Sequence, residues 1–302
     1  TEGTIRLSLS AIGGYDFEGG HFAEKGITPE GRVVDVPLYR HEVSLDFVRV
    51  ELSLQYTFLD DWDVWLRVPY EVKRQSVQLR QIDSQVSFRQ ALAQVNHTRT
   101  HHRTATYSGV SDLMLLVAKY WRGLLVEDDM LVVAWGVSIP TGQTERDPFV
   151  AGDRGQRHLH IQFGSGTVDP LLEVSYTLPL PASFSVGGFA AGRFPFYENG
   201  KGYRAPVDMT AGLRGGLSPT EWLSFGADLT FYWQSFAAWN GTRDVNSGLV
   251  SFMGGAGVTL SPGGGVVINF GARYPIHTES LAEDGDTFEQ GPSLLFSVAW
   301  TY

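Results

Sequence analysis

Bulky apolar residues alternate with polar or small residues over many short stretches of the chain. In 223–236, for example, Leu223, Phe225, Leu229 and Phe231 share one parity. A period of two places successive side chains on opposite faces of a β-strand. The pattern therefore predicts an all-β chain of about twelve strands. They lie at 4–17, 43–58, 63–77, 109–121, 130–139, 168–178, 183–196, 207–217, 223–236, 249–260, 266–277 and 291–302.

Short and long connections alternate between these strands. The short ones are rich in Pro, Gly and Asp, which is typical of tight turns, and they include 59–62, 179–182, 218–221 and 261–265. The long ones are polar and include 18–42, 78–108 and 140–166. An up-and-down transmembrane barrel has this arrangement, with short periplasmic turns and long extracellular loops.

We therefore predict a single domain, residues 1–302, that folds as a transmembrane up-and-down antiparallel β-barrel of about twelve strands. Ten or fourteen strands are the alternatives. The alternation changes phase near Phe47, so we expect a bulge there or a strand that extends beyond the membrane. Outward-facing aromatic residues predict two girdles at the membrane interfaces; they include Tyr56, Tyr70, Trp222, Trp233, Tyr274 and Trp300.

The last predicted strand has a bulky apolar residue at each even position and ends in an aromatic residue. A closed barrel would pair this strand on both edges, whereas a soluble sandwich, the alternative, would leave it exposed. The segment resembles the insertion signal of bacterial outer-membrane barrels, which implies that Phe296, Val298, Trp300 and Tyr302 direct insertion. The expected partners are the barrel-assembly machinery, outer-membrane lipid and lipopolysaccharide.

Composition excludes several classes of protein. No apolar run reaches the roughly eighteen residues of a membrane helix, and a mean hydropathy of -0.09 fits a barrel, which alternates its apolar residues with polar ones. The absence of cysteine excludes disulfides and thiolate sites. A formal net charge of -10 argues against nucleic acid as a partner. We expect that a signal peptide was removed on the way to the bacterial outer membrane.

Three short motifs carry a resemblance to a known family. Residues 109–113 with 118–120 are similar to a G-x-G-D-L…K-Y strand, 138–142 to an L-P-T-G strand end, and 164–169 to a G-x-G-x-x-D strand start. These motifs resemble the outer-membrane transporter family named for the meta-pathway of phenol degradation. Ser111 and Ile139 depart from its usual Gly and Leu. The resemblance implies a carrier or channel, with no catalytic residues and no settled substrate.

Charged residues fall mainly on the parity that faces the barrel interior. A twelve-stranded barrel has a backbone diameter on the order of 24 Å, so its lumen is narrow or plugged. The charges form either an ion-pair network that stiffens the wall or a constriction that selects a small polar or amphipathic solute. The candidate lumen-lining residues are Arg49, Glu51, Arg67, Glu71, Lys73, Asp112, Glu173, Arg193, Asp208, Arg214, Asp228 and Arg273.

Several histidines lie in the long connections: His97, His101, His102, His158 and His160. Imidazoles can bind zinc or copper, but solvated loop histidines are the simpler interpretation, and we predict no metal and no cofactor. The acidic run 283–286 with Glu289 lacks the spacing of a calcium loop. We expect a solvated outer loop there, which divalent ions could bridge to lipopolysaccharide phosphates.

We expect a channel or transporter for passive passage of small solutes, aromatic or amphipathic ones among them, and not an enzyme. The main alternative is a structural or docking barrel whose long outer loops bind a surface protein. A lipid-modifying enzyme is less favoured, because the chain lacks a G-x-S-x-G elbow. A pair of Ser165 with His158 or His160 is the catalytic arrangement that could be drawn.

Overall fold

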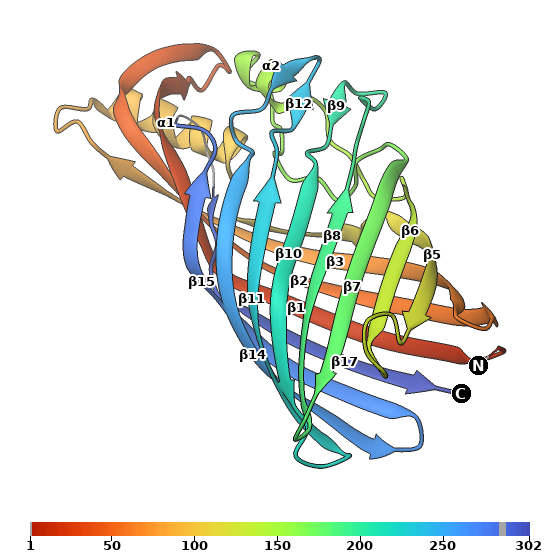
Figure 1. The fold of residues 1–302 in the computed structure, drawn as a ribbon. Helices are drawn as coiled ribbons and strands as arrows, with labels where there is room; N and C mark the ends of the chain where they lie inside the picture. Colours follow the sequence, from red (N-terminus) through yellow and green to blue (C-terminus); the bar gives the residue numbers. More distant parts are fainter. Residues whose placement is uncertain (1, 284–287) are drawn as a thin grey trace.

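The computed structural model describes residues 2–283 and 288–302. Twelve antiparallel strands close into a barrel (Figure 1), which confirms the predicted fold class. The last strand pairs with the first, from Thr301 opposite Arg6 to Ser293 opposite Gly14. The barrel segments are β1 (Ile5–Ile27), β2 (Val33–Leu59), β3 (Trp62–Gln81), β4 (Ala105–Val110), β5 (Leu113–Arg122), β6 (Met130–Ile139), β7 (Asp169–Leu180), β8 (Phe184–Arg193), β10 (Asp208–Leu217), β11 (Leu223–Gln234), β14 (Leu249–Gly263), β15 (Val266–Ser280) and β17 (Ser293–Thr301).

The first two strands are much longer than predicted. β1 and β2 stay paired up to Ile27 opposite Val33, so 18–42 is an extended hairpin and the prediction of a long loop there is wrong. Strand pairing satisfies the backbone N–H and C=O groups in water as well as in lipid. A hairpin that projects beyond the membrane needs no lipid-facing apolar stripe, so the alternation that marks the other strands does not mark this part.

The change of phase near Phe47 reflects this extension. β2 shows no register shift at Phe47; the shift lies in β1, between Gly14 and Phe17. There Phe17 packs against Phe47 with a distance of 5.3 Å between ring centroids. The predicted fourth strand is also interrupted, because β4 and β5 both pair with β3 but leave Ser111 and Asp112 outside the ladder.

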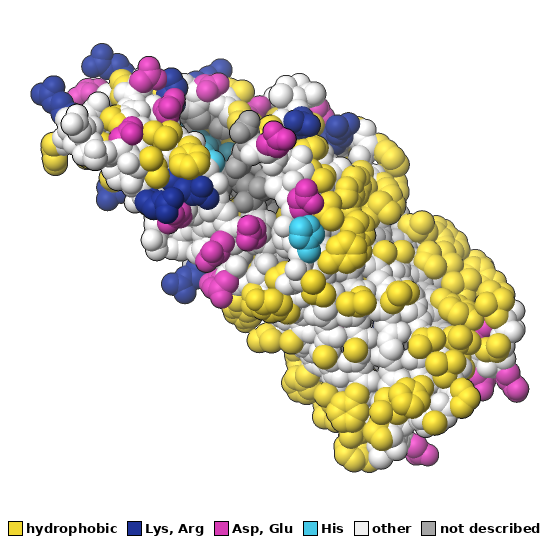
Figure 2. All heavy atoms as spheres, turned by 60° about the vertical axis from the view of Figure 1, so that its left-hand side comes forward, with side chains coloured by type: hydrophobic (Ala, Val, Ile, Leu, Met, Phe, Trp, Pro, Cys, Tyr) yellow, Lys and Arg dark blue, Asp and Glu magenta, His cyan; other side chains and the backbone are white. Residues whose placement is uncertain are grey.

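The outer face of the wall is apolar. Figure 2 shows hydrophobic side chains over the strands toward the short turns, while most Lys, Arg, Asp and Glu gather at the opposite end. In β11, Phe225 and Leu229 are 47% and 58% exposed, whereas the inward Thr230 is buried. The 12 residues of β11 are enough for a tilted strand to cross a bilayer.

The short turn between β5 and β6 is held by one carboxylate. Asp129 accepts hydrogen bonds from the backbone N–H groups of Leu124, Leu125 and Val126 and from the Tyr176 hydroxyl. Burial alone would raise the pKa of Asp129, but these four hydrogen bonds outweigh it and lower the pKa to about 2. The turn is therefore held by an ionised group at neutral pH.

The end of the barrel opposite the short turns carries a folded cap (Figure 1). We call it the outer cap and define it as residues 18–42, 78–108, 143–160, 194–207 and 235–248. It contains the β1–β2 hairpin, α1 (Phe88–His101), α2 (Pro148–Asp153), and a small sheet of β9 (Tyr203–Arg204), β12 (Ala238–Trp239) and β13 (Thr242–Arg243). At the base of the hairpin, β16 (Phe288–Glu289) pairs with β1 at Glu18 and Gly19.

The cap helices begin at recognisable capping residues. Ser87 and Gln90 form a capping box at the start of α1, and Asp147 caps α2 directly before Pro148. The alternation pattern predicted neither helix and did not predict the small sheet. Among the described residues, neither helix has the length and apolar character needed to cross a membrane.

Candidate functional site in the barrel lumen

The inward charges of β2, β3 and β7 form a connected set of ion pairs. Arg49 lies 3.0 Å from Glu51 and 3.6 Å from Glu71, which also pairs with Lys73 at 2.8 Å. Arg67 makes a bidentate contact with Glu173, at 2.6 and 2.9 Å. This last pair joins β3 to β7 past the two strands between them. This network contains six of the candidate lumen residues: Arg49, Glu51, Arg67, Glu71, Lys73 and Glu173.

A second group lies on β8, β10 and β11. Arg193 Nη2 lies 2.6 Å from Asp208 Oδ2, and the other oxygen of Asp208 accepts hydrogen bonds from the Tyr232 hydroxyl and the Gln234 amide, both at 2.9 Å. A carboxylate with these three partners is held in one orientation. Tyr232 and Gln234 were not among the predicted site residues, although both share the inward parity of Asp228.

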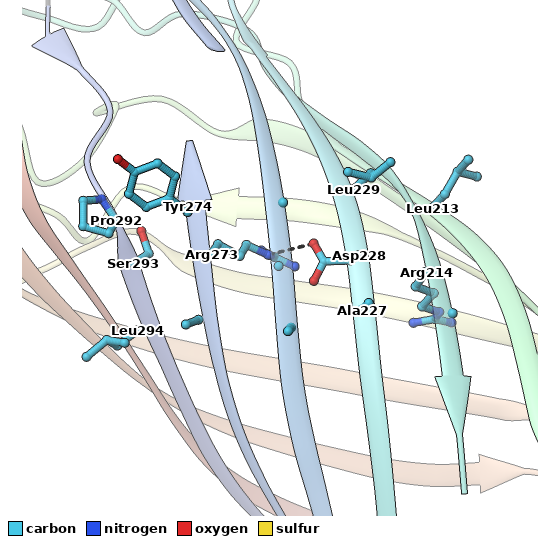
Figure 3. Close-up of a pocket in the computed structure, with 15 residues that line it drawn as sticks. Leu213, Arg214, Ala227, Asp228, Leu229, Arg273, Tyr274, Pro292, Ser293 and Leu294 are labelled. Carbon is cyan, nitrogen blue, oxygen red and sulfur yellow. Dashed lines mark hydrogen bonds and ion pairs between the residues drawn. The ribbon is translucent and has the colours of Figure 1, made fainter. Parts of the chain in front are cut away.

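Two cationic residues reach across glycines in the neighbouring strands. Asp228, Gly255 and Arg273 form one row across β11, β14 and β15, and Arg273 Nε donates to Asp228 Oδ2 at 3.0 Å over the glycine (Figure 3). A Cβ on Gly255 would lie 2.5 Å from Asp228 Oδ1 and 2.9 Å from Arg273 Cγ. The absence of a side chain at Gly255 therefore makes room for the ion pair.

Arg214 makes an analogous contact. It crosses Gly187 of β8 and donates to the Thr177 hydroxyl on β7 at 2.7 Å. A Cβ on Gly187 would lie 3.2 Å from Arg214 Nε. The partner here is neutral, so Arg214 keeps an uncompensated charge in this contact.

Asp112 fastens a loop to the inner wall. Its carboxylate accepts hydrogen bonds from the backbone N–H of Gly142, at 3.0 Å, and from the N–H and hydroxyl of Ser165, at 2.7 and 3.0 Å. One side chain thus holds both ends of 142–165. It occupies the gap between β4 and β5, where no strand ladder uses its own backbone.

The segment 161–165, which we call the inner segment, lies against the lumen wall. Lys73 Nζ donates to the backbone carbonyl of Gln162 at 2.9 Å and lies 5.0 Å from the centroid of the Phe163 ring. Gln162 and Phe163 were not among the predicted site residues, because nothing in the sequence of a polar loop marks the part that folds inward.

Two adjoining cavities lie inside the barrel, and a third lies at the base of the β1–β2 hairpin. The cavity at the hairpin base, about 620 Å³, is lined by Glu18, Arg40 and Phe288 among others. Of the two inside the barrel, the middle cavity, about 400 Å³, is lined by Phe288, the inner segment and Arg49, and the other, about 350 Å³, by Arg49 and Ser297 among others. Phe288 and Arg49 therefore stand where neighbouring cavities meet.

Three residues of the resembled insertion signal lie on β17, and Tyr302 directly follows it. Phe296, Trp300 and Tyr302 are 38%, 47% and 61% exposed on the outer face of the barrel, and Val298 has the same parity. Their role in insertion stays a prediction. The acidic run 283–286 lies mostly outside the described residues, and Glu289 belongs to β16.

The interpretation of the loop histidines as solvated is wrong. His102 and His158 are 4% and 8% exposed, and His97, His101 and His160 are half-buried in the same cluster. Burial, with smaller contributions from neighbouring histidines, lowers the pKa of His97 to about 4 and that of His101 well below its usual value. The imidazoles of His97 and His101 are therefore neutral at pH 7.

Ser165 has a structural position. Its side chain is 1% exposed, and its hydroxyl lies 3.0 Å from Asp112 Oδ2 and 3.1 Å from the Thr167 carbonyl. A nucleophile must be within reach of its substrate. The geometry therefore makes Ser165 an anchor for the inner segment.

No family model matches the chain, and no curated protein matches it either. Among solved structures, an outer membrane channel of Pseudomonas putida F1 is similar with a TM-score of 0.62 and 15% identity, over 100% of this chain and 96% of that one. The translocator domain of the autotransporter NalP of Neisseria meningitidis is similar with a TM-score of 0.46 and 9% identity, over 99% of this chain and 88% of that one. The CymD monoaromatic hydrocarbon channel follows at 0.44 and 9%, over 100% and 88%. We infer only the fold from the first likeness and nothing from the other two: the chain has the fold of an outer-membrane β-barrel.

Proposed function

We propose that this chain is a channel of the Gram-negative outer membrane for the passive passage of small amphipathic solutes, aromatic ones among them. The observation that carries the proposal is the pair of adjoining cavities inside a closed barrel, both of which Arg49 lines. The fold shared with the outer membrane channel of Pseudomonas putida F1 supports both the location and the activity.

The lining of the middle cavity supports the class of solute. Leu45, Met114 and Phe163 contribute apolar surface there, while Arg49, Glu71 and Lys73 contribute charged groups of both signs. A solute that combines an aromatic or aliphatic body with a polar group finds a partner for each part. The narrow lumen admits small molecules only.

The test is conductance across planar bilayers. If the lumen conducts, Arg67→Gln and Arg273→Gln remove positive potential from a narrow passage, and the reversal potential across a salt gradient shifts toward cation selectivity. Glu71→Gln and Asp228→Asn shift it the other way. Arg32→Gln, at the exposed tip of the β1–β2 hairpin, is the matched control and leaves selectivity unchanged.

A wild-type protein that inserts but passes neither ions nor small aromatic acids in liposome swelling would contradict the channel. If the four lumen variants then only lower the melting temperature, the charges serve to stiffen the wall.

The outer cap supports the second candidate, a docking barrel for a surface protein. A passive pore does not require two helices and a separate sheet above its mouth. In such a case, a chain with α1 replaced by a short Gly-Ser linker would still insert and conduct, but it would lose the surface partner that crosslinking detects on intact cells.

A further inference from the structure

Seven of the eight histidines of the chain meet in the outer cap, although they come from four separate stretches. His21 lies on β1 and His41 on β2, where the two residues are directly opposite each other. α1 contributes His97 and His101, and His102 is its C-cap. The segment after α2 contributes the remaining two, His158 and His160.

Four of these imidazoles surround one point. One ring nitrogen from each of His21, His41, His101 and His102 lies within 4.8 Å of the other three. The centroid of the His21 ring lies 5.1 Å from that of His41, 5.6 Å from that of His101 and 5.5 Å from that of His102. His41 is 0% exposed and His102 is 4% exposed. A second set of three, made of His101, His158 and His160, meets the same distance limit.

Neighbouring groups fix which nitrogen of two rings carries the lone pair. The Thr98 hydroxyl donates its hydrogen to the Gln94 carbonyl at 2.9 Å. Its contact with His41 Nε2, at 3.1 Å, is therefore one in which His41 Nε2–H donates to the hydroxyl oxygen. The lone pair of His41 is then on Nδ1. His158 Nδ1 donates to the Gln156 carbonyl at 2.8 Å, which leaves its lone pair on Nε2. Such outer hydrogen bonds orient histidines in metal sites.

The chemistry of the set suits a transition metal. Both sets are made of imidazoles alone, without a carboxylate to stabilise imidazolium ions. Imidazole is a preferred ligand of Zn²⁺, Cu²⁺ and Ni²⁺. A tetrahedral ion with Zn–N bonds of about 2.0–2.1 Å separates its nitrogen ligands by roughly 3.3 Å. The four nitrogens therefore need only small side-chain rotations to reach this spacing.

We propose that His21, His41, His101 and His102 bind one divalent transition-metal ion in tetrahedral geometry. The four-membered set is preferred to the three-membered one because it fills a tetrahedral shell without a ligand from outside the chain. The bound ion joins the β1–β2 hairpin to the C-terminal end of α1. It is thus a tie within the outer cap.

The experiment uses full-length protein without a histidine tag, refolded in detergent and freed of metal with EDTA. Zn²⁺ content after equilibrium dialysis gives one ion per chain, and Co²⁺ gives the intense visible absorption of a tetrahedral site. His21→Asn and His41→Asn each lower the affinity at least about tenfold, since loss of even an outer partner of a ligand costs that much. His277→Asn is the matched control, because His277 lies on β15 beside Glu279, outside the cluster, and it leaves binding unchanged.

Two results would overturn the proposal. The first is a wild-type chain that binds no more Zn²⁺ than a chain with both His21→Asn and His41→Asn. The second is binding that His158→Asn abolishes while His21→Asn leaves it intact, which would assign the ion to the three-membered set. Circular dichroism and the heat-dependent electrophoretic shift of barrels identify any variant that fails to fold. If the variant of the fully buried His41 fails to fold, the conclusion rests on His21→Asn, because His21 is half-buried.

Discussion

The barrel wall and the outer cap are stabilised in different ways. In the wall, the period of two sets whether a side chain meets lipid or lumen, and most of the inward charges described above are paired with an opposite charge on the same or a nearby strand. In the cap, histidines far apart in sequence meet because a long hairpin and a helix pack together. The wall is therefore sensitive to which face a residue occupies, whereas the cap is sensitive to which segments meet.

The largest effect is expected for a charge on the lipid face. Leu229 is 58% exposed on β11, and Leu229→Arg should destabilise the barrel by about 2–4 kcal/mol because lipid replaces water around the guanidinium. Phe88 is 83% exposed on α1, and Phe88→Arg should change stability by less than about 0.5 kcal/mol. Urea unfolding in liposomes measures both. Equal effects would show that Leu229 does not face lipid.

Removing one member of an ion pair should destabilise the protein more in the barrel wall than in the outer cap. Glu173→Ala leaves the half-buried Arg67 without its bidentate partner and should cost about 2 kcal/mol. Asp35→Asn breaks the exposed contact with Lys25 in the hairpin and should cost about 0–1 kcal/mol. The same unfolding experiment compares them. Recovery of stability in an Arg67→Met, Glu173→Leu double variant would identify the unpaired charge as the cause.

A smaller effect is expected from filling the space over a glycine. Gly255→Ala brings a methyl group to 2.5 Å from Asp228 Oδ1, which should displace the Arg273 pair and cost about 1–2 kcal/mol. Gly200, in the cap, has open space around its Cβ position, so Gly200→Ala should be neutral within about 0.5 kcal/mol. If both substitutions are neutral, the ion pair does not depend on the space at Gly255.

The position of the aromatic girdles can be tested on the unaltered protein. Tyr56, Trp222 and Trp300 lie near the short turns, and Tyr70, Trp233 and Tyr274 lie further toward the cap, as two interfacial girdles require. Quenchers attached to lipids at graded depths should quench tryptophan fluorescence chiefly at headgroup depth. Maximal quenching at the bilayer centre would contradict the girdles.

Sequence alone was sufficient where lipid imposes a pattern. β6 (Met130–Ile139) has the predicted bounds, and β10, β11 and β15 each begin within one residue of their own predicted start. The pattern failed where strands leave the membrane, as in the β1–β2 hairpin, because water accepts polar residues on both faces. It also missed the gap at Ser111 and Asp112, since two polar residues do not interrupt the alternation visibly.

The candidate site divides in the same way. The inward charges follow from parity, so sequence could name Arg67, Glu173 and Asp228. Their partners depend on the register and on which strands are neighbours, and the position of Phe163 depends on how a long loop folds back. The histidine cluster was the least accessible to prediction, because His21 and His41 meet α1 only through the tertiary fold.

The two-ended attachment of 142–165 to Asp112 has an electrical consequence. A loop held at one end can swing across a pore and interrupt the current, which gives the flickering typical of mobile plugs. Here both ends are fastened to the same carboxylate by three hydrogen bonds, so the inner segment is a fixed part of the lumen wall. If the barrel conducts as proposed, single-channel recordings should show low current and little noise, and Asp112→Ala should add brief closures at the same open-channel conductance.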